Sequence, residues 1–269
     1  MCGRFVASRP VEDIARLLDV DEVDVPPELA APRWNIAPQA EVLAVTSSRH
    51  DPTLRRLSAF RWGLVPWWAK DPAIGARAFN AKVETVEEKA MFRGAVSHQR
   101  CIIPADAFYE WAPAEAGQGR RKQPWCYRPA DSGLLLLGGL WERWRPKGEK
   151  EAGDPSRAGA GAHVEAGDTG EAREPATTLR SCTILTMEAN ELVGRVHNRM
   201  PVLIAERDLE AWLSPEPLAA GELNSLIHPV PAGVLEAFRV STAVNDAREE
   251  GPELVDPIAE DDGGQAQLF

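Results

Sequence analysis

The residues best suited to covalent chemistry stand at the start of the chain, where Met1 is followed by Cys2. Methionine aminopeptidases remove an initiator methionine when the second residue is small, so we expect the mature chain to begin with Cys2. Its terminal amine, with a reference pKa of about 7.7 to 8.0, and its thiol, near 8.5, are both partly available as nucleophiles. Such a 1,2-aminothiol condenses with an aldehyde to an imine, and the sulfur then closes a five-membered thiazolidine. The alternative is an ordinary cysteine that happens to follow the initiator.

A second candidate is the carboxylate of Glu110, which stands in the run Phe108-Tyr109-Glu110-Trp111. Three aromatic neighbours would partly exclude water from this carboxylate, which would raise its pKa and suit it to proton transfer. Strand alternation equally allows Glu110 to point outward into solvent. The residues alone leave these two alternatives open.

Two adjacent tryptophans, Trp67 and Trp68, follow Pro66 and are themselves followed by Lys70-Asp71-Pro72. Neighbouring side chains of a single strand or helix point in different directions. We therefore expect a loop that exposes aromatic surface.

The other three cysteines, Cys101, Cys126 and Cys182, lie far apart, with no spacing typical of a metal site. They stand in apolar, strand-like surroundings, so we expect small core residues and cytosolic thiols rather than a disulfide framework. The sequence predicts neither a metal nor a cofactor.

The 269 residues include 44% hydrophobic residues, enough to bury a sizeable core as one large domain or two small ones. No apolar run approaches the roughly 20 residues of a membrane span, and no signal peptide is apparent. These features predict a cytoplasmic protein that does not enter the membrane.

The formal net charge of −11 is unevenly distributed along the sequence. Residues 12–28, 147–176 and 246–269 carry net charges of −6, −3 and −7, which leaves +5 on the remainder. The body of the chain is therefore mildly basic, which permits a phosphate-binding face without demonstrating one.

The elements that must position these residues are mostly strands. We expect them at 41–46, 57–65, 101–111, 180–186, 202–205 and 237–241, with a strand pair, 123–128 and 134–144, around the turn Asp131-Ser132-Gly133. Expected helices cover 11–18, 86–99, 189–196, 208–213 and 218–227. Because strands outnumber helices and do not alternate with them regularly, an antiparallel α+β fold is favoured.

Residues 147–176 are rich in Gly, Ala, Glu and Pro without periodicity. We expect a disordered insertion there, and a disordered acidic tail at 246–269. The predicted domain spans residues 2–245.

Five separated segments and two further C-terminal matches resemble the SRAP family, the SOS-response-associated proteins that process abasic DNA. They are Cys2-Gly3-Arg4-Phe5, Trp34-Asn35-Ile36-Ala37-Pro38, Trp62-Gly63-Leu64-Val65-Pro66-Trp67-Trp68, Phe79-Asn80-Ala81-Lys82-Val83-Glu84-Thr85 and Phe108-Tyr109-Glu110-Trp111, with Thr186 and His197-Asn198-Arg199-Met200-Pro201. The resemblance covers residues 2–245 apart from the insertion.

The resemblance implies a single α+β domain with a mainly antiparallel, barrel-like β core and peripheral helices. It also implies binding of single-stranded DNA and single-strand to double-strand junctions, and a covalent thiazolidine crosslink between mature Cys2 and the ring-opened aldehyde of an abasic site. A minor lyase activity would follow from the imine intermediate. A monomer is expected, nucleoid-associated when bound to DNA.

The resemblance also assigns roles to four catalytic residues. Cys2 would supply both nucleophiles, and Asn80 would orient the amine or the sugar. Glu110 would take or hold the amine proton. His197 would protonate the sugar ring oxygen during opening, although without the resemblance the default interpretation is a capping or core histidine at a helix end.

The same resemblance implies a set of DNA-binding residues. Phosphate ligands would be Arg4, Arg77, Lys82 and Arg199, the aromatic wedge would be Trp67 and Trp68, and the cleft would be lined by Asn35, Pro38 and Thr186. The family often has arginine where this chain has Lys82, which keeps the charge but loses bidentate phosphate geometry.

Two competing functions remain. A thiol peptidase would use Cys2, Glu110 and His197, with the protein's own initiator methionine as a candidate substrate. A plain single-stranded DNA-binding module would carry no chemistry and would bind intact and abasic strands alike.

Overall fold

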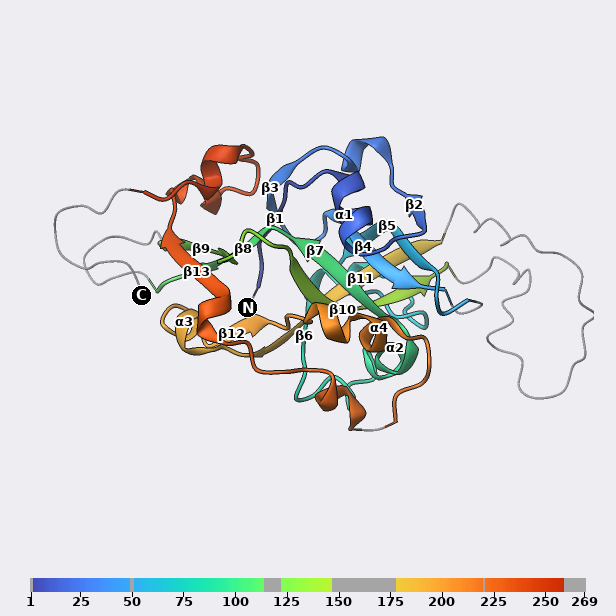
Figure 1. The fold of residues 1–269 in the computed structure, drawn as a ribbon. Coiled ribbons are helices and arrows are strands. Elements are labelled where there is room, and N and C mark those ends of the chain that lie inside the picture. The colour runs from blue at the N-terminus through green and yellow to red at the C-terminus, as the bar shows by residue number, and fades with distance from the viewer. Residues whose placement is uncertain (1, 49–50, 114–121, 147–177, 220, 259–269) are drawn as a thin grey trace, which may run out of the picture.

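A closed five-stranded barrel forms the centre of the molecule (Figure 1). The computed structural model describes residues 2–48, 51–113, 122–146, 178–219 and 221–258. The barrel strands are β4 (Glu41–Ser47), β5 (Arg55–Trp62), β7 (Arg100–Ala105), β10 (Leu135–Trp144) and β11 (Leu179–Glu188). Neighbours in the order β11-β10-β7-β4-β5 pair antiparallel, and a parallel contact of β11 with β5 closes the ring. The predicted α+β fold with a mainly antiparallel, barrel-like core is confirmed.

Three short strands extend the barrel sheet. Both β6 (Asn80–Lys82), which is parallel, and β12 (Arg199–Pro201), which is antiparallel, pair with β11. The third, β2 (Glu22–Asp24), pairs with β5. Strand β11 therefore brings together two motifs that lie more than a hundred positions apart in the sequence.

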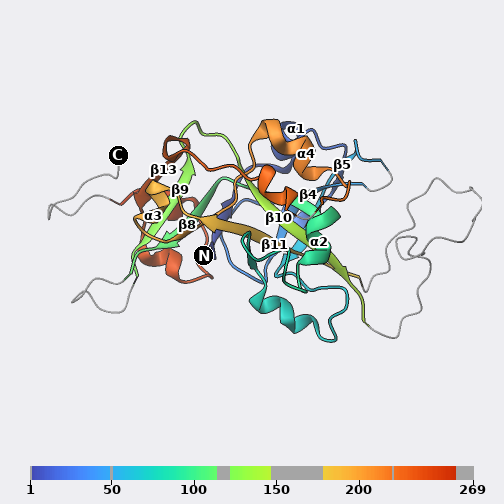
Figure 2. The ribbon, with the colours of Figure 1, turned by 90° about the horizontal axis from the view of Figure 1, so that it is seen from below.

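A second, five-stranded antiparallel sheet lies beside the barrel, and the part of it that is labelled in both views lies to the left of the barrel strands β4 and β5 (Figures 1 and 2). Its order is β13 (Leu235–Arg239), β9 (Pro124–Pro129), β8 (Ala107–Trp111), β1 (Phe5–Ala7) and β3 (Arg33–Ile36). In both views the N-terminal end of the chain lies close to β8.

The two faces of this small sheet are buried in different ways. Phe5 and Phe108 pack in the core cluster that also contains Trp62 and Ile184 of the barrel region. Tyr109, one residue further along β8, packs in a separate cluster with the C-terminal segment. This alternation follows from the period of two in a strand, and it turns Glu110 toward the barrel side together with Phe108.

The α-helices are short: α1 (Val11–Leu17), α2 (Arg93–His98), α3 (Glu191–Gly194) and α4 (Leu209–Leu213). Seven 3-10 helices complete the described elements, at Pro27–Leu29, Pro72–Arg77, Glu206–Asp208, Glu222–Ser225, Ala232–Val234, Thr242–Asn245 and Pro252–Val255. The buried Arg100 joins α2 and α4 to the barrel by donating to the carbonyls of Val96 and Trp212 at 2.9 and 2.8 Å.

The predicted pairing of strands 123–128 and 134–144 is wrong. Strand β9 pairs with β8 and β13 in the small sheet, whereas β10 pairs with β7 and β11 in the barrel. The turn between them passes the chain from one sheet to the other. Arg9 holds this turn by donating to the carbonyls of Ser132 and Gly133.

Other predicted boundaries shift. The expected strand 101–111 is two strands separated at Asp106, whose carboxylate accepts from the backbone N–H groups of Ser8 and Arg9. Of the expected helix 86–99 only Arg93–His98 is α-helical, and of the expected helix 218–227 only a 3-10 turn at Glu222–Ser225 forms. The expected strand 202–205 is replaced by Arg199–Pro201.

The expectation of a disordered tail is wrong for residues 246–258. This stretch contains the 3-10 helix Pro252–Val255, and Pro257 pairs with Val240. Backbone carbonyls at positions 246 and 249 accept from the buried side chain of Asn35, which explains the order of an acidic segment with few large apolar residues. Residues 259–269 and the insertion 147–176 lie outside the described residues.

Within the described residues, no helix is long and apolar enough to cross a membrane.

Candidate active site

Cys2 is fully buried where the small sheet meets the barrel, with an exposed fraction of 0%. The side-chain Nδ2 of Asn80 donates to the Cys2 carbonyl oxygen at 2.6 Å. Asn80 is held by β6, whose parallel register places it opposite Ile184 of β11. Its Oδ1 is buried and has no hydrogen-bond partner within the described part of the chain. The amide therefore fixes the first residue of the expected mature chain and keeps an acceptor available beside it.

Glu110 is also buried, with 2% of its surface exposed. The backbone N–H of Tyr109 donates to the Arg4 carbonyl at 3.0 Å, so the Glu110 end of β8 runs beside the first residues of the chain. Burial raises the pKa of Glu110 to about 7, and this rise is opposed by the positive charge of the chain's N-terminus and, less strongly, by that of Lys122. The prediction of a desolvated carboxylate, rather than an outward-pointing one, therefore agrees with the structure.

The Cys2 thiol has a pKa well above its ordinary value. Burial is the main cause, and the negative charge of Glu110 adds to it. The two side chains are thus close enough to interact electrostatically. At neutral pH the thiol is protonated, and its proton must go to a base when the sulfur reacts.

His197 lies at the turn between α3 and β12. Its Nδ1 accepts from the backbone N–H of Arg199 at 3.0 Å, which assigns the proton of the neutral ring to Nε2. Burial lowers the pKa of His197 below its ordinary value. Val193 and Val196, which precede it, pack in the same core cluster as Cys2.

Arg199 is held by an ion pair with Glu84. Its two terminal nitrogens donate to the two Glu84 carboxylate oxygens at 2.6 and 2.9 Å, and one of them also donates to the Thr186 carbonyl at 2.6 Å. The Arg199 side chain keeps 13% of its surface exposed. Thr186 is fully buried, so its side chain supports β11 from within.

Arg4 and Asn35, both predicted to contact DNA, have hydrogen-bond partners inside the protein. Arg4 donates to the Asn35 Oδ1 at 2.6 Å and to the Val244 carbonyl at 2.9 Å, and it lies over the Trp111 ring. Asn35 is 2% exposed and donates to the carbonyls of Asp246 and Glu249, each at 2.9 Å. Both side chains bind the C-terminal segment.

The predicted aromatic wedge is exposed. Trp67 has 53% and Trp68 39% of its surface accessible. Their loop begins at Gly63, whose φ of +145° and approach to Gly75 leave no space for a Cβ, since one would lie 2.5 Å from the Gly75 carbonyl oxygen.

The remaining predicted DNA ligands lie on the surface. Arg77 and Lys82 are exposed, and Pro38 is half-buried. Arg77 ends the 3-10 helix that follows the tryptophan loop, and Lys82 ends β6, so the two cations flank Asn80 in the chain.

The structure thus gathers Cys2, Asn80, Glu110 and the His197 turn around one end of β11 and β8. Sequence reasoning missed Tyr127, a buried hydroxyl on the strand beside Glu110. A single tyrosine in an apolar strand carries no signal that distinguishes it from a core residue.

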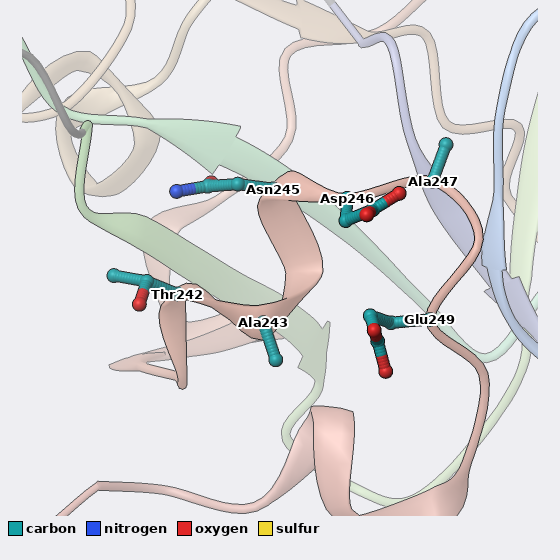
Figure 3. A pocket seen from close by; sticks show the side chains of 6 residues that line it. All are labelled: Thr242, Ala243, Asn245, Asp246, Ala247 and Glu249. Atoms are coloured by element: carbon teal, nitrogen blue, oxygen red, sulfur yellow. The ribbon is translucent and has the colours of Figure 1, made fainter.

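Sequence reasoning also missed a cavity of about 650 Å³ formed by the C-terminal segment (Figure 3). It is lined by Thr242, Ala243, Asn245, Asp246, Ala247 and Glu249. Its lining includes none of the predicted catalytic residues. Within the described residues, no group of three or more His, Cys, Asp or Glu side chains is arranged to hold a metal ion.

Residues 1–247 match the family model described as SOS response associated peptidase (SRAP). This chain belongs to the SRAP family. Two curated relatives are similar over nearly their whole length. The abasic site processing protein YoqW of Bacillus subtilis is 34% identical, covering 95% of this chain and 99% of its own, and YedK of Escherichia coli, with the same description, is 30% identical, covering 96% and 100%.

A eukaryotic relative is similar over a comparable length of this chain. The abasic site processing protein HMCES of Xenopus tropicalis is 25% identical, and the match covers 96% of this chain and 78% of HMCES. Among solved structures, the crystal structure of a protein from Bacteroides thetaiotaomicron superposes with a TM-score of 0.74 at 21% identity, covering 96% of this chain and all of the other. That likeness shows the SRAP fold.

Proposed function

We propose that this SRAP protein is a sensor of abasic sites in single-stranded DNA, and that mature Cys2 forms a covalent thiazolidine crosslink with the abasic sugar. The observation that carries the proposal is the hydrogen bond from Asn80 to the Cys2 carbonyl, made beside a buried carboxyl with a pKa near neutrality. The names of the relatives, abasic site processing proteins, agree with this substrate.

The first step joins the Cys2 amine to C1′ of the ring-opened abasic sugar. The amine nitrogen adds to the aldehyde carbon, and loss of water leaves an imine. The unpartnered Oδ1 of Asn80 accepts from the amine N–H and orients the nitrogen lone pair. With a pKa of about 7, Glu110 can release and accept a proton at physiological pH, as the dehydration step requires.

The second step closes the ring. The Cys2 sulfur adds to the imine carbon, the S–H proton passes to the Glu110 carboxylate, and Glu110 returns a proton to the nitrogen, which becomes the ring amine. This route suits a thiol whose pKa is raised by burial, because the base acts at the moment of bond formation. If the sulfur closes slowly, loss of a C2′ proton from the imine leads to β-elimination, a minor lyase reaction.

His197 serves the opening of the sugar. The closed sugar is a hemiacetal, and opening requires a proton on the ring oxygen. The Nδ1 of His197 lies 3.2 Å from the Arg199 carbonyl oxygen, so a protonated ring can donate there while Nε2–H is directed to the substrate. Because the pKa of His197 is lowered, its protonated ring gives up a proton readily.

The DNA strand passes over the surface that carries Trp67, Trp68, Arg77 and Lys82. Exposed tryptophans stack on bases, and cations beside Asn80 bind the phosphates that flank the lesion. Arg199, already bound to Glu84, contributes less to phosphate binding than an unpaired arginine.

The thiol peptidase alternative has less support. Cysteine peptidases need a thiolate, which a lowered thiol pKa provides. Burial and the Glu110 charge raise the pKa of Cys2 instead. Removal of its own initiator methionine, a single event, remains compatible with the site.

The proposal is tested by incubating untagged protein with single-stranded DNA treated with uracil-DNA glycosylase, followed by denaturing electrophoresis. We expect a denaturant-resistant shift that is absent for Cys2→Ala. Cys2→Ser keeps the amine and loses the sulfur, so its adduct is expected only after borohydride reduction of the imine. A wild-type protein that gives no adduct, or a Cys2→Ala protein that still gives one, would end the proposal.

A further inference from the structure

Tyr127 has a buried hydroxyl that the mechanism above does not use. The residue is fully buried, and its hydroxyl has no hydrogen-bond partner within the described residues. A buried polar group without a partner is costly and calls for an explanation, one of which is a functional role. By contrast, the hydroxyl of the neighbouring Tyr109 donates to the Trp34 carbonyl at 2.9 Å.

The strand register places Tyr127 on the same face as Glu110. In the β8–β9 pair, Tyr127 lies opposite Phe108 and Trp125 lies opposite Glu110. Because side chains alternate, Phe108, Glu110 and Tyr127 share the face that packs toward Cys2. Tyr127 stacks on Phe108 with ring centroids 5.0 Å apart and 11° between the planes. Glu110 and Tyr127 are diagonal neighbours, about 7 to 8 Å apart at the backbone, a separation that two long side chains can bridge.

The electrostatics agree with this placement. Burial raises the pKa of Tyr127 well above its ordinary value, and the charge of Glu110 raises it further. The hydroxyl therefore stays protonated, and it remains a donor, throughout the pH range in which Glu110 ionises.

We propose that Tyr127 is a positioning residue for the reaction: its hydroxyl donates a hydrogen bond to the Glu110 carboxylate once that carboxylate has lost its proton. The inference rests on the proposed function, in which Glu110 alternates between its two protonation states. The Glu110 side chain has three rotatable bonds, so a change of rotamer on ionisation brings the carboxylate to the waiting donor. A hydrogen bond to the charged form stabilises that form and fixes the direction of its remaining lone pairs.

The consequence for pH is specific. A donor to the carboxylate lowers the pKa of Glu110, so removing the donor raises it. One hydrogen bond to a charged group corresponds to a shift of about one pH unit. If Glu110 acts as the base, Tyr127→Phe should form the crosslink about tenfold more slowly than wild type at pH 6 and nearly as fast at pH 9.

The experiment is a single-turnover pH profile of crosslink formation for wild type, Tyr127→Phe and Tyr109→Phe. The Tyr109→Phe variant is the matched control, because it also removes one buried hydroxyl from the small sheet, but on the opposite face. We expect the midpoint to rise only in Tyr127→Phe. In a Glu110→Gln background, Tyr127→Phe should cause no further pH-dependent change. An unchanged midpoint in Tyr127→Phe, or equal shifts in both tyrosine variants, would overturn the proposal.

A direct titration separates this inference from the proposed function. The side-chain carboxyl carbon of Glu110 is followed by ¹³C NMR in wild type and Tyr127→Phe without DNA. A higher pKa in Tyr127→Phe supports the hydrogen bond even if no crosslink forms, and an equal or lower pKa refutes it even if crosslinking is normal.

Discussion

Replacing Glu110 with glutamine should stabilise the protein at alkaline pH while slowing its chemistry. The carboxyl ionises near its ordinary value of 4.5 in the unfolded chain and at about 7 in the folded protein. Between these pH values the folded state holds a proton that the unfolded state has lost, so the free energy of unfolding falls as pH rises. Since each tenfold change in proton affinity is worth about 1.4 kcal/mol, the loss approaches about 3 kcal/mol above pH 7.

Glutamine has nearly the same shape as glutamate and does not ionise, so the free energy of unfolding of Glu110→Gln does not fall in this way as pH rises. The stability difference between variant and wild type, measured by urea unfolding, should grow by roughly 2 to 3 kcal/mol in favour of the variant from pH 5 to pH 8. Glu110 is 2% exposed, so solvent screening does not reduce the effect much. The crosslinking rate of the variant should fall by at least about 100-fold, the contribution typical of a general acid or base.

Glu236→Gln provides the control. Glu236 lies on β13, two strands away from Glu110 in the small sheet, and pairs with Arg128 at the surface, where an ion pair is worth below about 1 kcal/mol. Its stability difference from wild type should stay nearly constant between pH 5 and pH 8. If the Glu110→Gln difference is also constant over this range, the carboxyl ionises normally in the folded protein, and the reasoning about its proton transfer is wrong.

Three further predictions concern the surrounding residues. Asn80→Ala removes the hydrogen bond to the Cys2 carbonyl, so single-turnover crosslinking should slow by at least about tenfold. The affinity of this variant for intact single-stranded DNA should stay within about twofold of wild type. Equal losses in crosslinking rate and affinity would point to a role in DNA binding alone. Trp67→Ala and Trp68→Ala should each weaken single-stranded DNA binding by about 10- to 100-fold in fluorescence anisotropy, since stacking is worth about 1 to 3 kcal/mol per base, without lowering the urea midpoint because both rings are exposed. Asn35→Ala leaves buried carbonyls without donors, so it should lower the free energy of unfolding by about 2 to 4 kcal/mol and speed proteolysis within residues 242–258. A variant as stable as wild type would contradict the interior role of Asn35.

The sequence predicted the fold well where local pattern and tertiary structure agree. The strands at 41–46, 180–186 and 237–241 were located because β-branched and apolar residues occur in short runs. The wrong pairing of 123–128 with 134–144 shows the limit. A short turn between two strands normally makes a hairpin, whereas here each strand pairs with partners far away in the sequence, β9 in the small sheet and β10 in the barrel.

The candidate site was only partly predictable, for similar reasons. Cys2 and Glu110 stood out by chemistry, since a penultimate cysteine and a carboxylate among aromatics are unusual. The interior hydrogen bonds of Asn35 were not predictable, because their acceptors lie in the C-terminal segment, more than 200 positions away in sequence. Nothing local to Asn35 in the sequence indicates that its amide donates to these carbonyls.

The complete burial of Cys2 constrains the order of events during biosynthesis. A maturation enzyme must engage an extended, accessible N-terminus, whereas the folded chain covers Cys2 with residues from positions 80 to 200. Trimming by such an enzyme must therefore occur on the nascent chain, before those later strands emerge and pack. If the proposed function holds, a molecule that folds with Met1 still attached must remove Met1 within its own site or stay inactive, so the fraction of active protein would depend on how trimming and folding compete during synthesis.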